Sequence, residues 1–277
     1  MPHQTPVTPA FGPAMSRRMI LGAIPATFLL AGCGGGTSEV VFESDDASGE
    51  SVDHSPWDRL LGEYVSASKD GINRVDYRRL KREASDDLRS YLTAMQAVKV
   101  EGLSRGEQFA FWVNLYNAVT IDVILENYPL DSIRDIGLLG QGPWKDNAVT
   151  VSGKTLSLDN IEHDILRPNW HDVRIHYAVN CASLGCPNLA TRAYTSDRVE
   201  PMLEEGAAAY INHPRGFAER DGAIVASGIY DWYRDDWGSV GAVLDHARKY
   251  AKGRTAELLD GATEIAGYDY NWSLNQA

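Results

Sequence analysis

The sequence predicts one folded domain of the α/β or α+β class, with central strands framed by helices. Three observations predict this class. The 277 residues are 44% hydrophobic and 23% charged, which is the composition of a globular protein that can bury a sizeable core. Residues 105–126 are apolar nearly all round and long enough for a buried helix. Over residues 173–180, apolar side chains recur at every second position, as in a strand.

The first part of the chain predicts export. Arg17 and Arg18 precede a short apolar run that ends in Leu30-Ala31-Gly32-Cys33. The run is too short for a stable membrane-spanning helix, and small residues before a cysteine are typical of a bacterial lipoprotein signal. We therefore expect residues 1–32 to be a signal peptide and Cys33 to carry the lipid. The exported protein would then be anchored at the periplasmic face of a membrane, after general or twin-arginine export.

Residues 33–55 predict a flexible tether, because Gly, Ser, Glu and Asp dominate this stretch and cannot bury enough apolar surface to order it. The globular domain is expected over residues 56–277. The formal net charge is −12, and no basic stripe interrupts the acidic composition, so a nucleic-acid partner is not expected. Gly140-Gln141-Gly142 lacks the third glycine of a dinucleotide fingerprint, and nothing else in the sequence indicates a cofactor.

The remaining elements follow from hydrophobic spacing and from Gly and Pro positions. Asp70-Gly71 ends the first helix region, Tyr128-Pro129 ends the long apolar helix, and Pro168 should stop a helix that begins at a capping box at Asp159. The expected helices are 57–65, 86–98, 105–126, 159–167, 197–211 and 240–251, and the expected strands are 148–151, 173–180 and 223–226.

Two asparagines, Asn114 and Asn117, share one face of the long apolar helix because they are three residues apart. A buried carboxamide without partners costs about 1 to 3 kcal/mol, so both should be hydrogen-bonded. They either tie down neighbouring backbone or belong to a polar pocket, and the sequence leaves both readings open.

The stretch from Arg174 to Leu189 is the candidate site, because it holds one histidine and two of the three cysteines. His176 and Asn180 would share one face of the expected strand. After Cys181, a loop rich in Gly and Pro would carry Cys186 back past the end of that strand.

Five segments resemble, in this order, the family known as domain of unknown function 547. They are Phe109–Val119, Leu158–Arg167, Arg174–Leu189, Ser227–Trp237 and Tyr268–Asn275. The resemblance covers roughly residues 105–275 and implies membership of that family. It implies no particular activity, because the family's biochemistry is unassigned and its members occur both alone and fused to other modules.

One hypothesis for the site is a thiol-dependent hydrolase or acyl transferase. His176 would be the base, and Cys186 or Cys181 the nucleophile. Cys186 is preferred slightly, because five residues along a strand would place Cys181 on the face opposite His176. The group that orients the base would be one of three side chains: Glu162, Asn114 or Asn117.

The alternative is a non-catalytic binding or structural module in which a Cys181–Cys186 disulfide fixes the loop, since disulfides are expected in an exported protein. A zinc site made by His163, His176 and the two cysteines is less favoured, because the cysteine spacing lies at the edge of the usual range. The acids of residues 231–236 stand beside aromatic residues and are given no role. The ligand is expected to be a peptide or small molecule of unknown identity.

Overall fold

The computed structural model describes residues 49–137 and 141–277, which fall within one unit of the chain, Gly36–Ala277. The expected signal peptide, the lipidated Cys33 and most of the expected tether lie outside the described residues. Helices dominate the chain and three small, largely antiparallel sheets lie among them, which makes the fold α+β, one of the two classes that the sequence predicted. No helix in the described ranges has the length and apolarity needed to cross a membrane.

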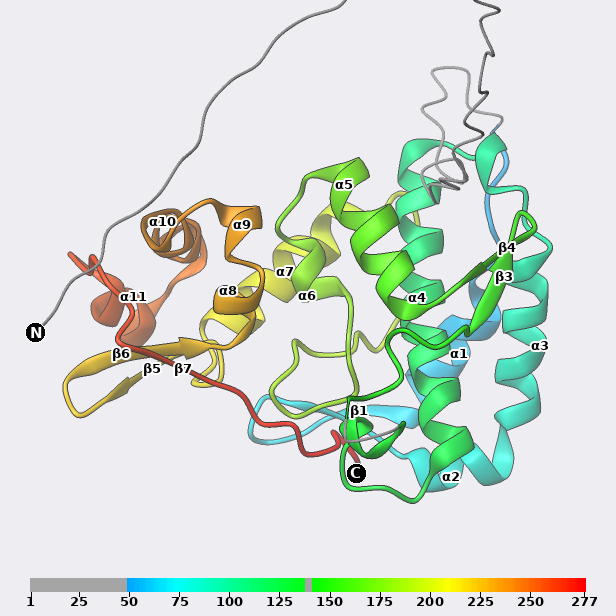
Figure 1. Cartoon of the computed structure of the whole chain (residues 1–277), viewed down its shortest axis with the longest axis horizontal. Helices are drawn as coiled ribbons and strands as arrows, with labels where there is room; N and C mark the ends of the chain where they lie inside the picture. The colour runs from blue at the N-terminus through cyan, green and yellow to red at the C-terminus, as the bar shows by residue number, and fades with distance from the viewer. Residues whose placement is uncertain (1–48, 138–140) are drawn as a thin grey trace, which may run out of the picture. The chain divides into compact units, whose positions relative to one another are not determined.

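The N-terminal half consists mainly of helices, and α3 packs beside α4 (Figure 1). The predicted helices at 57–65, 86–98 and 105–126 are confirmed. The helices of this half are α1 (Ser55–Tyr64), α2 (Tyr77–Glu83), α3 (Ser85–Gln96), η2 (Val100–Gly102), α4 (Arg105–Asn127) and η3 (Ile133–Asp135).

Helix α4 is the central helix of this half. Sixteen of its 23 residues are buried, which explains why the sequence is apolar nearly all round. The Ser104 hydroxyl accepts a hydrogen bond from the Glu107 backbone N–H and so caps the first turn. The helix ends one residue before Tyr128-Pro129, as predicted.

The sheets are short. Antiparallel pairs are formed by β1 (Val65–Ala67) with β2 (Asn73–Val75) and by β3 (Val149–Val151) with β4 (Lys154–Leu156). In the third sheet, β6 (Ala223–Ser227) pairs antiparallel with β5 (Phe217–Arg220) and parallel with β7 (Gly267–Asp269). The strands predicted at 148–151 and 223–226 correspond to β3 and β6.

The strand predicted over residues 173–180 is wrong. Residues Ile175–Ala178 form a single helical turn, α6, after a turn in which the Asp172 carboxylate accepts from the Arg174 N–H. Such local side-chain bonds compete with strand pairing. All four residues of α6 are buried, so the alternation in the sequence did not mark a buried and an exposed face.

The helix predicted to stop at Pro168 instead continues to Trp170, as a π-helical turn, η5 (Asn160–Leu166), followed by α5 (Arg167–Trp170). Proline lacks the N–H that an α-helix needs at this position, and the wider π turn before it changes which backbone groups pair. The predicted capping box at Asp159 is also wrong, because the Ser157 hydroxyl accepts from the Asn160 N–H.

The C-terminal half packs around a second hydrophobic cluster, and α6 connects the two clusters. Ile175 and Ala178 belong to the larger cluster, and Tyr177 belongs to the smaller one. His176 therefore lies where the two clusters meet. The remaining helices are α7 (Val199–Ile211), α8 (Ile229–Trp232), α9 (Arg234–Trp237), α10 (Val240–Tyr250) and α11 (Gly253–Leu259).

Candidate functional site

A cavity of about 690 Å³ lies between α4, η5, α6, the loop that follows α6, α8 and the C-terminal segment. Its lining includes Glu162 and His163 from η5, His176 from α6, and both Cys181 and Cys186 from the loop. The structure thus brings four of the six candidate catalytic residues to one cavity. Its volume is within the range of small-molecule sites.

His176 is held by ionic and aromatic contacts. Its Nε2 lies 2.6 Å from Asp236 Oδ2, and its Nδ1 lies 3.9 Å from Glu162 Oε1. The ring stacks on Tyr233 and on Trp237, with centroids 4.2 and 5.2 Å away, and only 3% of the residue is exposed. An ionised carboxylate only accepts hydrogen bonds, so Asp236 assigns the proton to Nε2 and leaves Nδ1 on the side of Glu162.

Arg167 fixes Asp236 in turn. Its Nε and Nη2 donate to the two oxygens of Asp236, each at 2.7 Å, and its Nη1 donates to His163 Nδ1 at 2.7 Å. Burial raises the pKa of Asp236, but hydrogen bonds from His176 and Arg167 outweigh it and hold that pKa well below its usual range. Asp236 is therefore an anion at every physiological pH, and it fixes the orientation of the imidazole.

Cys181 and Cys186 are free thiols whose sulfurs lie 3.2 Å apart. Around Cys181, the Tyr270 hydroxyl lies 3.0 Å and the Ser183 hydroxyl 3.3 Å from the sulfur. Hydrogen bonds from Cys186, Ser183 and Tyr270 lower the pKa of Cys181, although burial opposes them. Cys181 is also the partly exposed cysteine of the pair.

Cys186 has the opposite character. It is buried, its sulfur accepts a hydrogen bond from the Cys181 backbone N–H at 3.0 Å, and burial raises its pKa well above the usual range. The preference for Cys186 as the nucleophile depended on the expected strand, which the structure does not contain. The geometry favours Cys181.

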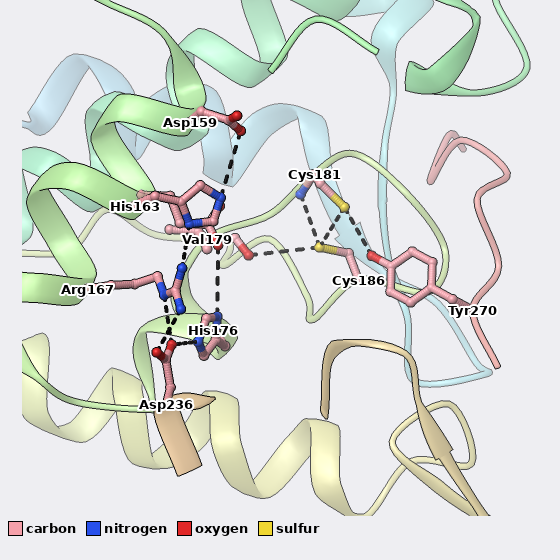
Figure 2. A network of polar contacts seen from close by, with 10 residues as sticks. Asp159, His163, Arg167, His176, Val179, Cys181, Cys186, Asp236 and Tyr270 are labelled. Atoms are coloured by element: carbon pink, nitrogen blue, oxygen red, sulfur yellow. Dashed lines mark hydrogen bonds and ion pairs between the residues drawn. The ribbon is translucent and has the colours of Figure 1, made fainter. Parts of the chain in front are cut away.

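The structure does not join His176 to either sulfur. Across the described residues, the hydrogen-bond and ion-pair partners of the His176 ring are Asp236 and Glu162. Figure 2 shows the imidazole network and the thiol network as separate groups, with Val179 drawn between them and its carbonyl 3.8 Å from Cys186 Sγ. The expected direct contact between imidazole and sulfur is therefore absent in this state of the chain.

Asp236 has the orienting position for which the sequence offered Glu162, Asn114 or Asn117. It lies sixty residues after His176, so no local spacing connects the two. A signal was nevertheless present, because Asp236 belongs to the segment Ser227–Trp237, where acids stand beside aromatic residues.

Asn114 and Asn117 are not part of the cavity lining, and both tie down loops. The Asn114 amide donates to the Tyr194 carbonyl and accepts from its N–H. The Asn117 amide donates to the Ala178 carbonyl and accepts from the Asn180 N–H. Of the two readings that the sequence left open, this geometry favours the one in which the amides hold neighbouring backbone. Asn117 holds the backbone on both sides of Val179.

The ligands considered for zinc do not converge. In residues 49–137 and 141–277 there is no group of three or more His, Cys, Asp or Glu side chains arranged to hold a metal ion. His163 instead accepts from Arg167, and the thiols contact one another.

The fold and the site define an α+β protein with a cavity lined by a thiol pair and by a histidine that Asp236 orients. A family model described as "Protein of unknown function, DUF547" matches residues 100–211. The motifs predicted a resemblance to this family, and the match supports it over that stretch, which is less than half of the chain. The match includes Glu162, His176 and both thiols, whereas Asp236 and Tyr270 lie outside it. Comparisons with curated proteins and with solved structures gave no match.

Proposed function

We propose that the protein is a thiol-dependent hydrolase or acyl transferase with Cys181 as its nucleophile. The observation that carries this proposal is the environment of the Cys181 sulfur. It is partly exposed at the cavity wall, and three hydrogen bonds lower its pKa. A thiolate is the reactive form of cysteine, so these contacts favour attack on a carbonyl carbon.

Because His176 does not contact either sulfur, the thiol contacts and the His176–Asp236 pair would act in different steps. The Cys181 thiolate attacks the carbonyl carbon of an ester or amide, and the bond to the leaving group breaks as that group takes a proton from solvent. Water or an acceptor then attacks the thioester, loses its proton to His176 Nδ1 and restores the thiolate. Asp236 supports this step by stabilising the imidazolium through Nε2.

The test is alkylation and acylation of the purified mature chain in detergent. Iodoacetamide should label Cys181 with a rate that titrates below the usual thiol pKa of about 8.5. With p-nitrophenyl acetate, intact mass should show one acetyl group on wild type and on Cys186→Ser, and none on Cys181→Ser. Equal acetylation of Cys181→Ser would overturn the proposal.

The second candidate is a non-catalytic module with a Cys181–Cys186 disulfide. The specific observation in its favour is the sulfur separation of 3.2 Å, because a small approach would bring the atoms to the bond length of about 2.05 Å. Mass analysis of the protein as isolated from the periplasm decides between the two. Complete oxidation, together with an unchanged cellular phenotype of Cys181→Ser, would favour this module.

The cellular address is also a proposal. The lipoprotein signal before Cys33 supports anchoring at the periplasmic face of a bacterial membrane. Labelled palmitate should be incorporated into wild type and not into Cys33→Ala, and only wild type should partition into a detergent phase. Equal partitioning of the two proteins would contradict the anchor.

A further inference from the structure

Arg215 lies beside the cysteine loop, mostly buried and without a carboxylate partner. Its Nη1 donates to the Leu184 carbonyl at 3.2 Å, its Nη2 donates to Asn188 Oδ1 at 2.7 Å, and the guanidinium lies 5.2 Å from the centre of the Tyr210 ring. No Asp or Glu in the described residues lies within ion-pair distance of it. Within residues 49–137 and 141–277, its partners are thus two neutral acceptors and one aromatic ring.

Other partly buried arginines differ from Arg215 in this respect. Arg167 pairs with Asp236, Arg174 with Asp172 and two glutamates, and Arg248 with Asp245. A buried charge without a counter-charge is unfavourable, which explains why such groups are usually paired. Arg215 is therefore an exception, because no carboxylate of the described residues neutralises its charge.

The donors of Arg215 are also incompletely used. A guanidinium has five N–H groups, and Nε of Arg215 is buried without any hydrogen-bond partner. Burial lowers the pKa of Arg215, which is the expected response of a cation that lacks a nearby anion. Arginine stays charged in proteins, so the positive charge remains.

Arg215 lines a second cavity of about 290 Å³, which also includes Arg220, Asp269 and Tyr270. Arg220 is paired with Asp269 at 2.5 Å. Two guanidiniums and one carboxylate leave an excess positive charge in this cavity, although the whole chain has a formal charge of −12. A local positive site in an acidic protein concentrates anions.

We propose that this cavity binds an oxyanion, a phosphate or a carboxylate group, between Arg215 and Arg220. Guanidinium groups match the paired oxygens of both anions. The site shares only Tyr270 with the lining of the thiol cavity, and it does not depend on the proposed thiol chemistry. Because Arg215 also holds the Leu184 carbonyl and Asn188, a bound anion would fix the loop that contains the two cysteines.

The test is thermal unfolding of the mature chain in phosphate, sulfate, acetate or chloride at matched ionic strength. A ligand that binds only the folded state raises the unfolding midpoint with saturation. We expect at least one oxyanion to raise it saturably and chloride to have no such effect. Phosphate and sulfate acting alone would identify a tetrahedral anion, whereas acetate acting alone would identify a carboxylate. A wild-type midpoint that responds to all four salts equally would overturn the proposal.

Variants test the residues. Arg215→Gln should lose the oxyanion-dependent shift, whereas Arg248→Gln, which removes an arginine that also donates to backbone carbonyls, should retain it. Asp269→Asn removes the competing carboxylate and frees Arg220, so half-saturation should need several-fold less anion. If Arg215→Gln does not fold, Asp269→Asn decides alone. An unchanged half-saturation in that variant, or a full shift in Arg215→Gln, would contradict the site.

Discussion

The two walls of the large cavity stabilise their reactive groups in different ways. Cys181 is surrounded by neutral donors, a second thiol and two hydroxyls. His176 is surrounded by charge, with Asp236 bonded to one nitrogen and Glu162 near the other. Under the proposed mechanism, the neutral donors rather than the imidazole would stabilise the Cys181 thiolate. His176 would then be available for proton transfer to the substrate or to water.

The largest expected effect comes from Cys181→Ser. The thioester cannot form without this sulfur, so acylation with p-nitrophenyl acetate in a single turnover should fall by at least about 10³-fold. Cys186→Ala removes only one of the three hydrogen bonds to the thiolate and should slow acylation by about tenfold. If the two variants lost activity equally, the two thiols would act as one unit, and Cys181 would not be the nucleophile on its own.

Asp236→Asn tests the charged surroundings of His176. An amide cannot hold the imidazole proton at Nε2 as a carboxylate does, so deacylation should slow by about 10²- to 10⁴-fold. The rate of iodoacetamide alkylation at Cys181 should not change, because the thiol has its own donors. Asp235→Asn is the control, since Asp235 is the adjacent exposed acid. Alkylation that slowed together with deacylation would show that the two networks are coupled, and the comparison would fail.

The contrast between charged and neutral surroundings extends to two other histidines. Burial lowers the pKa of His54 and of His246 to about 4, and neither has a carboxylate bonded to its ring. The unfolded chain therefore takes up protons first as pH falls. The contribution of these histidines to the free energy of unfolding should be fully present above pH 6.5. It should be lost as the pH falls to 4, by up to about 3 kcal/mol per histidine.

Urea unfolding at several pH values measures this decline. His54→Asn keeps an acceptor near the Tyr91 hydroxyl, which now bonds His54 Nδ1 at 2.8 Å, and removes the titrating ring. Its stability should depend less on pH between 4 and 6.5 than that of wild type. The same pH dependence in both proteins would mean that His54 does not carry the effect.

The sequence predicted most helices correctly because the spacing of apolar residues and the length of an apolar run are local properties of the chain. Helix α4 is the clearest case, since its buried residues are continuous along the chain. The strand at residues 173–180 was wrong, because alternation of apolar residues marks a strand only where the residues between them are exposed. His176 and Ala178 are buried as well. Burial by two hydrophobic clusters is a tertiary property that local spacing does not contain.

The candidate site was predicted in part for a similar reason. His176, Cys181 and Cys186 lie close together in sequence, so their presence at one cavity could be expected from the stretch itself. Asp236 reaches His176, and Tyr270 reaches the cavity, from segments far along the chain, so their partners follow only from the fold. The acids at 235 and 236 look alike in sequence, yet Arg167 and His176 contact only the second.

The smallest expected effect is on the alkylation rate of Cys181, and it should distinguish Asn117 from Asn114. Each amide makes the same pair of backbone hydrogen bonds from the same helix, so Asn117→Ser and Asn114→Ser should each lower the free energy of unfolding by about 1 to 3 kcal/mol. Only Asn117 holds the backbone between α6 and Cys181. Asn117→Ser should therefore also change the alkylation rate of Cys181 by a few-fold, measured under conditions where both variants are folded.

Asn114→Ser should leave that rate as in wild type, because its loop at Tyr194 does not contact the thiols. Equal alkylation rates in the two variants would show that Ser183, Tyr270 and Cys186 alone set the position of the sulfur. In that case the position of the Cys181 sulfur would be independent of α4 as well as of the imidazole.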